Sequence, residues 1–313
     1  MSDPVEGRVE PISRAHRVSM PGACDCHVHV FEPARFGYVL PRTYTPGAAP
    51  LAGLQHMLTH AGLDRVVVVQ PSAYGTDNRC LLDALGRLGT QSARGVAVVD
   101  IDRTTDQELE ALISGGVRGL RLNLEVRGER NAGSAARQLK RARDLVLGSG
   151  LALQLYADIA VVEVLADDIA TAGVPIVLDH FGGLRADRGP EQAGLTTLLA
   201  LVRERLVYVK LSAPYRTGSA GPDYAEAGLL ARALVAAGPG QLMWGSDWPH
   251  TGSSSNRSGD LSRIEPFRAE DAGRTLDLLA DWVPDKEVRR QILVDNPAAL
   301  FGFSLDIPRK DLQ

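Results

Sequence analysis

Short apolar runs alternate with longer amphipathic segments along the chain from about residue 22 onward. Runs such as Val66–Val69 and Ile176–Leu178 are almost continuously apolar, which is typical of parallel strands buried on both faces. The segments between them repeat apolar residues with the helical period. Several of these segments end at a glycine, as at Gly115 and Gly173, and glycine favours the left-handed end of a helix. The pattern therefore predicts a repeated strand–helix unit.

Eight strands and nine helices follow from this pattern. The predicted strands are Ala23–Val30, Arg65–Gln70, Gly95–Val99, Gly119–Leu124, Leu151–Tyr156, Pro175–His180, Val207–Ser212 and Gln241–Asp247. The predicted helices are Leu51–Ala61, Asn78–Leu88, Asp106–Ser114, Ala135–Leu147, Ile159–Ala172, Leu195–Glu204, Tyr224–Ala236, Thr275–Trp282 and a closing helix over Asp285–Leu300. Pro41–Pro50 and Thr251–Asp260 are expected to be loops because they are rich in proline, glycine, serine and threonine.

We expect these units to form one α/β domain, a (β/α)8 TIM barrel over residues 22–303, between an N-terminal leader (1–21) and a C-terminal tail (304–313). The 313 residues suit this fold, because such barrels run to about 250 residues or more as one domain. The alternative is an open doubly wound sheet. That fold favours a glycine-rich phosphate-binding turn, and the chain contains neither GxGxxG nor GxxxxGK[ST].

Composition narrows the function classes. The chain is 44% hydrophobic and carries a net charge of −4, as ordinary globular proteins do, with no basic excess that would indicate nucleic-acid binding. No apolar run approaches the roughly 18 residues of a membrane span, and the N-terminus lacks the apolar stretch of a secretory signal. We expect a cytoplasmic protein without nucleic-acid or membrane partners. Three cysteines, Cys24, Cys26 and Cys80, are too few for a disulfide framework and are expected to be small buried residues.

Polar residues occupy nearly all of the predicted strand ends, where barrel enzymes place their active sites. They are Asp25, His27 and His29; Gln70; Arg121 and Asn123; Gln154 and Tyr156; Asp179 and His180; Lys210 and Ser212; and Ser246, Asp247 and His250.

The first strand carries the most informative pattern. Strict alternation places Asp25, His27 and His29 on one face, and Cys24 and Cys26 on the other with the following valines. Two adjacent imidazoles suit a divalent metal or an anionic group, although a hydrogen-bonded pair of core histidines would have the same spacing. The further histidine on strand six and the aspartate on strand eight favour a functional site.

These residues suffice for the hydrolysis of an ester. Asp247 is the candidate general base, which takes a proton from water. His27, His29 and His180 are the candidate electrophilic donors, which stabilise the charge that develops on the carbonyl oxygen. By contrast, His56 and His60 lie four apart without the glutamate of a HExxH motif, so we expect them on an outer helix surface.

Three arginines indicate an anionic substrate. Arg121 points inward from strand four, Arg127 lies in the following loop and Arg216 lies just beyond strand seven. Guanidinium groups bind carboxylates through paired hydrogen bonds. Surface ion pairing is the alternative, favoured for Arg127. Further candidate substrate contacts are Tyr156, His250, Ser72 and Tyr74.

The segments Asp25–Phe31, Leu178–Gly183 and Trp244–His250 resemble those of the amidohydrolase superfamily. Within it the chain is most similar to the 2-pyrone-4,6-dicarboxylate lactonases and their relatives that act on sugar lactones. The more general supporting segments are Gln70–Asn78, Gly116–Asn123 and Lys210–Arg216, and the resemblance runs from about Gly22 to Phe301.

The resemblance implies a hydrolase that opens a carboxylated lactone in aromatic- or sugar-acid catabolism, with a water activated by Asp247 and the carbonyl surrounded by His27, His29 and His180. It leaves three alternatives: a zinc-dependent decarboxylase, which usually has a histidine where Tyr156 stands; a sugar-lactone isomerase; and an inactive ligand-binding barrel, which would have lost catalytic residues that are present here.

The resemblance also bears on metal content. Binuclear branches of the superfamily use a carboxylated lysine on strand four and a histidine on strand five, where this chain has Arg121 and Asn123, then Gln154 and Tyr156. A binuclear centre is therefore not expected. One zinc or other divalent ion would be held by His27, His29 and Asp247 with His180 nearby. The lactonase branch works without a metal, which slightly favours a site with no required cofactor.

Overall fold

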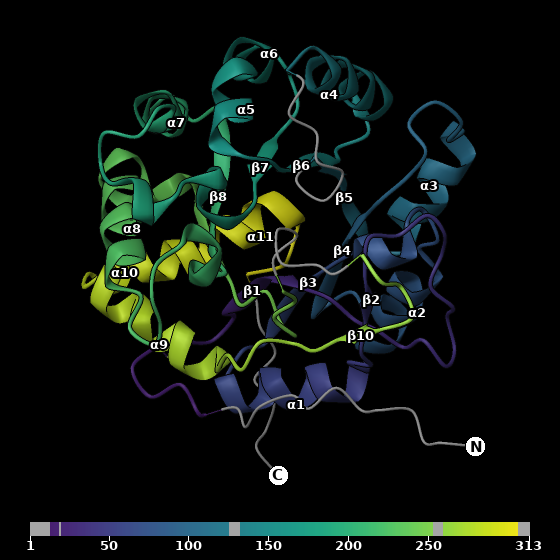
Figure 1. Ribbon diagram of the computed structural model, residues 1–313, viewed down its shortest axis with the longest axis horizontal. Coiled ribbons are helices and arrows are strands. Elements are labelled where there is room, and N and C mark those ends of the chain that lie inside the picture. The colour runs from purple at the N-terminus through teal and green to yellow at the C-terminus, as the bar shows by residue number, and fades with distance from the viewer. Residues whose placement is uncertain (1–12, 19, 125–131, 253–258, 306–313) are drawn as a thin grey trace.

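The computed structural model describes residues 13–18, 20–124, 132–252 and 259–305 and has eight parallel strands at its centre, with helices outside them (Figure 1). The strands in spatial order are β1 (Cys24–Val28), β3 (Arg65–Val69), β4 (Ala93–Ala97), β5 (Val117–Asn123), β6 (Ala152–Tyr156), β7 (Ile176–Leu178), β8 (Val207–Ser212) and β9 (Leu242–Gly245). Each neighbouring pair is parallel, as the strand–helix repeat requires.

The sheet closes on itself between β1 and the segment after β9. The amide of Asp247 donates to the carbonyl of His27 at 2.9 Å, and the amide of His29 donates to the carbonyl of Trp248 at 2.8 Å. Gly245 is required at this seam, because a Cβ there would lie 2.8 Å from the Cβ of His27. The predicted TIM barrel is confirmed.

Helices cover the outside of the barrel in sequence order. They are α1 (Leu51–Ala61), α2 (Arg79–Leu88), α3 (Asp106–Ser114), α4 (Ala132–Val146), α5 (Ile159–Val164), α6 (Ala166–Ala170), α7 (Leu195–Arg203), α8 (Ala225–Ala237), α9 (Ala272–Trp282), α10 (Lys286–Arg290) and α11 (Asn296–Phe301). Short 3₁₀ turns include η1 (Ser72–Tyr74), η2 (His180–Gly183) and η4 (Pro214–Thr217), and Gln291–Asp295 forms a π-helical turn.

Several predicted boundaries were wrong. The helix expected over Ile159–Ala172 is two helices that meet at Leu165, after a β-branched run that lowers helix propensity. The strand expected over Pro175–His180 ends at Leu178, because His180 and Phe181 adopt positive φ. The segment 41–50, expected to be a loop, contains the short strand β2 (Thr45–Pro46), which pairs with β10 (Ile264–Glu265) after the second predicted loop.

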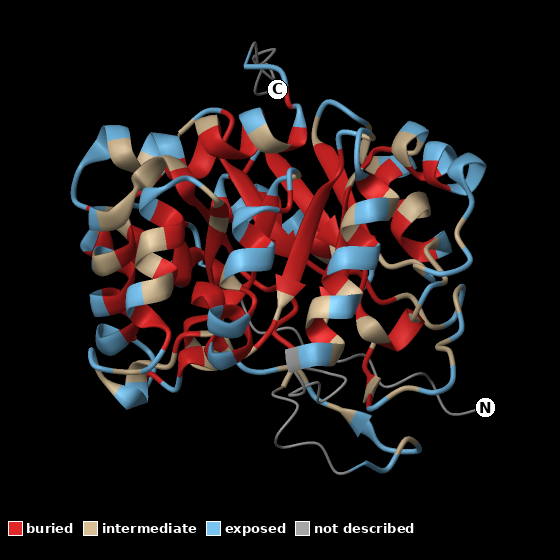
Figure 2. Cartoon of the chain, turned by 90° about the horizontal axis from the view of Figure 1, so that it is seen from above, coloured by how far each residue is buried: buried red, intermediate tan, exposed pale blue. Residues whose placement is uncertain are grey.

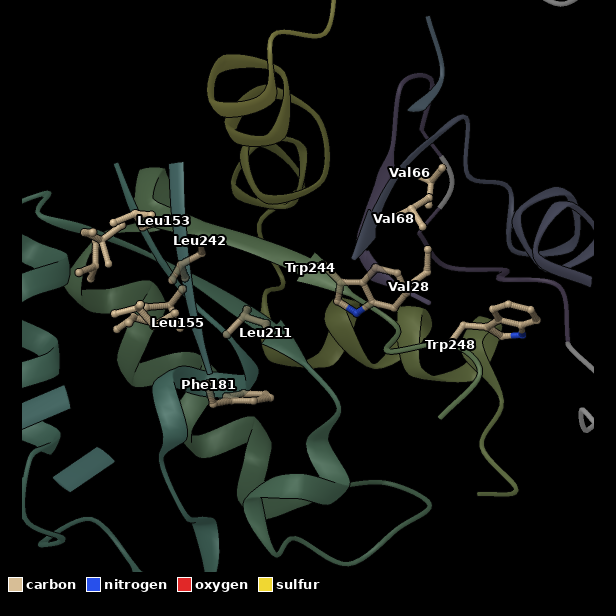
Figure 3. Packing of buried hydrophobic residues seen from close by; sticks show 14 of the residues in the cluster. Val28, Val66, Val68, Leu153, Leu155, Phe181, Leu211, Leu242, Trp244 and Trp248 are labelled. Atoms are coloured by element: carbon tan, nitrogen blue, oxygen red, sulfur yellow. The ribbon is translucent and has the colours of Figure 1, made fainter. Parts of the chain in front are cut away.

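Apolar side chains form the core between the strands and the helices. Figure 2 shows that the central strands are buried and that exposed residues lie on the outer faces of the helices. In this layer Val66, Val68 and Val28 pack near Trp244 and Trp248 (Figure 3). A second cluster, which includes Val67, Val69 and Met243, packs with Phe301 and Phe303 of the C-terminal segment. Cys24, Cys26 and Cys80 are free and buried, as predicted.

A β-bulge in β1 breaks the predicted alternation. Asp25 pairs with Val66 and Val28 pairs with Val68, so three steps on β1 match two on β3. Cys26 therefore packs with the cluster of Val67, whereas Val28, two residues later, packs in the cluster of Val68. The expectation that Cys26 and Val28 share a face was wrong, because it assumed a regular strand.

Candidate active site

A pocket opens at the C-terminal ends of the strands, where the polar strand ends predicted it. Its lining consists of His29, Tyr44, Pro71, Ser72, Arg121, Asn123, Tyr156, His180, Arg216, Asp247 and Thr251. These residues come from separate strand ends and from the loops that follow them. The barrel thus brings together side chains that lie far apart in the sequence.

Asp247 lies at the centre of this site, just after β9 and with a positive φ of 64°. Its Oδ2 accepts hydrogen bonds from the Tyr215 hydroxyl at 2.6 Å and from Nε and Nη2 of Arg216 at 3.0 and 2.8 Å. Burial alone would raise the pKa of Asp247, but the charge of Arg216 and the neighbouring imidazoles outweigh it and hold that pKa well below its usual range. Asp247 is therefore an ionised carboxylate.

The other carboxylate oxygen of Asp247 faces three imidazoles. Oδ1 lies 3.5 Å from Nε2 of His27, 3.5 Å from Nε2 of His29 and 3.9 Å from Nε2 of His180. Within the described part of the chain this oxygen has no hydrogen-bond partner. An unpartnered buried carboxylate oxygen that faces three ring nitrogens is suited to hold water, a substrate or a cation.

The outer ring nitrogens are fixed by neighbouring groups. Nδ1 of His29 lies 2.8 Å from the carbonyl of Val69, and because a carbonyl only accepts, this nitrogen carries a proton. Nδ1 of His180 lies 2.9 Å from the hydroxyl of Ser212. Burial lowers the pKa of His180 to about 3, so its ring is neutral at ordinary pH.

Beneath the pocket lies a buried polar layer centred on Asp179. Its Oδ2 accepts hydrogen bonds from Nη2 of Arg121 at 3.2 Å and from Nε2 of Gln154 at 3.0 Å. Its Oδ1 lies 3.2 Å from Nδ1 of His27 and 3.3 Å from Nζ of Lys210. Burial would raise the pKa of Asp179, but His27, Lys210 and Arg121 outweigh it and hold that pKa well below normal. This layer supports His27 from below.

Asp25 ties the two edges of the barrel together below His27. Its Oδ1 accepts from the backbone amides of His27 and Ser246, each at 3.0 Å. Burial raises the pKa of Asp25 to about 7. Its position is therefore that of a structural link across the seam, which fixes the backbone that presents His27 and Asp247.

Most of the predicted site residues meet at this pocket. His27, His29, His180 and Asp247 form the cluster around Oδ1, and Ser72, Arg121, Tyr156 and Arg216 line the pocket beside it. Arg216 was expected to bind substrate directly, but its guanidinium contacts Asp247 and the carbonyl and hydroxyl of Thr251. Arg127 lies outside the described residues.

Two predicted residues lie away from the described pocket lining. The Tyr74 hydroxyl accepts a hydrogen bond from the amide of Glu32 at 2.9 Å, and the ring stacks on Phe31. The ring of His250 lies 6.3 Å from that of Tyr215, and burial lowers its pKa to about 4. His56 and His60 are exposed on α1, as predicted.

Sequence reasoning missed several residues of the site. Tyr215 is adjacent to Arg216, and its contact with Asp247 depends on the 3₁₀ turn η4. Tyr44 and Thr251 come from segments expected to be loops, where no periodicity marks them. Asp179 and Lys210 were noted only as polar residues at strand ends. The signal that could have indicated a role was the presence of charged residues on strands that were expected to be buried.

The site has the donor set for one divalent cation. His27, His29 and Asp247 each offer a ligand atom, and these atoms lie within 4.8 Å of one another. The unpartnered Oδ1 of Asp247 and Nε2 of His27 fit such an ion. The fit has one condition: His27 must carry its proton on Nδ1, so that Nε2 presents a lone pair.

The chain is similar in sequence to enzymes of known activity. The chain is 34% identical over 284 residues to a 4-sulfomuconolactone hydrolase from Rhizobium radiobacter, covering 90% of each chain. It is 28% identical over 298 residues to a D-galactarolactone isomerase from Agrobacterium fabrum, covering 90% of this chain and 92% of the relative.

A solved structure from Pseudomonas putida, described as a candidate 2-pyrone-4,6-dicarboxylic acid hydrolase, superposes with a TM-score of 0.75 at 33% identity. The superposition covers 91% of this chain and 99% of the other. The amidohydrolase family matches residues 24–303. This match and the relatives confirm the resemblance seen in the sequence motifs: the chain belongs to the amidohydrolase family.

Proposed function

We propose that the protein is a hydrolase that opens a carboxylated lactone by attack of water on the ester carbonyl. The observation that carries this proposal is the free Oδ1 of Asp247, which faces three imidazoles beside a buried arginine. Two relatives have names that specify the hydrolysis of acidic lactones, which supports the same reaction class.

In the proposed reaction Oδ1 of Asp247 accepts a proton from water while the water oxygen bonds to the carbonyl carbon. An imidazole N–H group that faces the pocket stabilises the oxyanion, which is the largest electrostatic contribution in reactions of this type. The tetrahedral intermediate then loses the ring oxygen, and the proton held by Asp247 passes to that oxygen. Tyr215 and Arg216 hold the carboxylate in position through Oδ2 throughout.

Arg121 is the proposed partner of a substrate carboxylate. It is buried and it lines the pocket together with Ser72, Asn123 and Tyr156. A cavity of about 750 Å³ adjoins the pocket, shares Ser72, Arg121 and Asn123 with it, and has Val98 and Val99 in its wall. The shared polar residues suit a lactone whose acidic substituent extends toward this cavity.

We propose that no metal is required, although one divalent ion is the alternative. An ion held by His27, His29 and Asp247 would polarise the carbonyl and lower the pKa of water. The lactones in the names of the relatives support a role in the breakdown of aromatic or sugar acids, which we propose takes place in the cytoplasm. Among the described residues no helix is long and apolar enough to span a membrane.

A lactone isomerase is the second candidate function, favoured by the similarity to a D-galactarolactone isomerase. The same residues would transfer the acyl group to a hydroxyl of the substrate instead of to water. The experiment that separates the two supplies purified protein with carboxylated lactones in H₂¹⁸O and measures the products by mass spectrometry. Hydrolysis yields an open hydroxy acid with one ¹⁸O in the new carboxylate. An unlabelled lactone of altered ring position would establish the isomerase instead. If none of the carboxylated lactones reacted, neither function would be supported.

A further inference from the structure

Lys210 lies on β8 with its side chain fully buried beneath the pocket. We propose that Lys210 sets the tautomer of His27, holding its proton on Nε2, so that His27 meets the pocket as a hydrogen-bond donor and not as a metal ligand. The proposal goes beyond the proposed function, because it holds whichever lactone is the substrate.

The contacts of Lys210 lead to this assignment. Its Nζ donates to Oε1 of Gln154 at 2.6 Å and lies 3.3 Å from Nδ1 of His27. The third neighbour, Oδ1 of Asp179, is an ion-pair contact at 3.3 Å. An ammonium group has three protons and no lone pair, so Nδ1 of His27 accepts if the contact is a hydrogen bond. A neutral imidazole that accepts at Nδ1 carries its proton on Nε2.

Asp179 is the competing partner for the same ring nitrogen. Its Oδ1 lies 3.2 Å from Nδ1 of His27, and a proton on Nδ1 would have to be donated to it, as in the carboxylate–histidine pairs of metal sites. The orientation of the two groups does not favour this hydrogen bond, because Oδ1 of Asp179 receives no aligned hydrogen bond from any described residue. The alignment therefore favours Lys210 as the donor and His27 as the acceptor.

The two histidines of the pair then have opposite tautomers. His29 donates from Nδ1 to the carbonyl of Val69, which leaves a lone pair on Nε2 when the ring is neutral. His27 presents a proton on Nε2, 3.5 Å from Oδ1 of Asp247. Metal binding would require His27 to move its proton to Nδ1 and to give up the hydrogen bond from Lys210. Lys210 is thus a positioning residue that acts through His27.

Nuclear magnetic resonance of protein labelled with ¹⁵N at histidine tests the assignment directly, because long-range ¹H–¹⁵N correlations distinguish the two neutral tautomers. The spectrum is recorded on wild-type protein after removal of metal with EDTA, and His27→Gln identifies the signal of His27. We expect the proton on Nε2 for His27 and on Nδ1 for His29. A proton on Nδ1 of His27 would overturn the proposal without need of any variant of Lys210.

The Lys210→Met variant tests the cause. We expect the proton of His27 to move to Nδ1 and the affinity for Zn²⁺, measured by calorimetry with the metal alone, to rise by about tenfold, the scale of effects from groups that orient metal ligands. Arg121→Met is the matched control, because it removes another cation from Asp179 without contact to His27 in the described structure. An unchanged tautomer in Lys210→Met, an unchanged Zn²⁺ affinity, or the same change in Arg121→Met would contradict the proposal. If Lys210→Met does not fold, the wild-type spectrum still decides the tautomer.

Discussion

Arg216 donates two hydrogen bonds to Oδ2 of Asp247, at 3.0 Å from Nε and 2.8 Å from Nη2. Asp247 is fully buried and Arg216 is partly buried, and the Arg216 charge is the main factor that keeps Asp247 ionised against the effect of burial on its pKa. Arg216 therefore acts on the carboxylate that we propose as the general base, although it also lines the pocket.

We predict that Arg216→Met lowers kcat/KM for acidic and neutral lactones alike. The expected loss is about 1.5–3 kcal/mol of transition-state stabilisation, the usual contribution of a charged hydrogen bond. Arg216→Lys should recover only part of it, because lysine cannot form the paired contact. A loss confined to acidic lactones would show that Arg216 binds substrate instead of orienting Asp247.

Arg121 is expected to behave differently. It lines both the pocket and the adjoining cavity, so Arg121→Met should weaken the reaction of carboxylated lactones by about 1.5–3 kcal/mol. A neutral lactone of the same ring size should be affected much less, since it offers no carboxylate. The measurement is kcat/KM on the matched pair. Equal losses on both lactones would assign Arg121 to the support of Asp179 alone.

Acid stability provides a prediction that is independent of the substrate. Burial lowers the pKa of His180 to about 3 and that of His250 to about 4, below the value of about 6.5 for an unfolded chain. The unfolded state binds these protons more readily than the folded state. The free energy of unfolding is therefore highest above the unfolded pKa of about 6.5 and falls as the pH decreases below it. Each histidine should lower the free energy of unfolding by about 2 kcal/mol between pH 7 and pH 5.

Urea unfolding of wild type and His250→Gln at the two pH values checks this. The variant should lose about 2 kcal/mol less than wild type on acidification, since glutamine does not titrate. A pH dependence identical in both proteins would mean that His250 is not held neutral in the folded state.

Metal content should not exceed one divalent ion per chain. The ends of β5 and β6 present Arg121 and Asn123, then Gln154 and Tyr156, which do not supply the lysine and histidine of a binuclear centre. Elemental analysis of purified protein after exposure to excess Zn²⁺ and desalting provides the count. Two stoichiometric zinc ions that activity requires would refute this part of the account.

The barrel and the cluster of histidines around Asp247 followed from the sequence because both depend on regular features. Continuous apolar runs specified the parallel strands, and the strand-end rule brought His27, His29 and Asp247 together. The bulge in β1 was not predicted, because the prediction assumed regular alternation and the sequence does not show where an extra residue is inserted.

Other parts of the site depend on turns and contacts that have no sequence period. Tyr74 is close to Ser72 in the sequence, but the 3₁₀ turn η1 directs its hydroxyl to the backbone of Glu32. The buried contact of Lys210 with His27 joins residues on separate strands, and their distance along the chain conceals it.

The central claim is that Asp247 takes the proton of the attacking water through its free Oδ1. The kcat of Asp247→Asn on carboxylated lactones, with 2-pyrone-4,6-dicarboxylate as the first test compound, measures this most directly. The substitution is nearly isosteric, and circular dichroism checks that the fold is retained. We predict a fall in kcat of about two orders of magnitude or more, as expected when a general base is lost. Turnover near that of wild type in a folded variant would contradict the account.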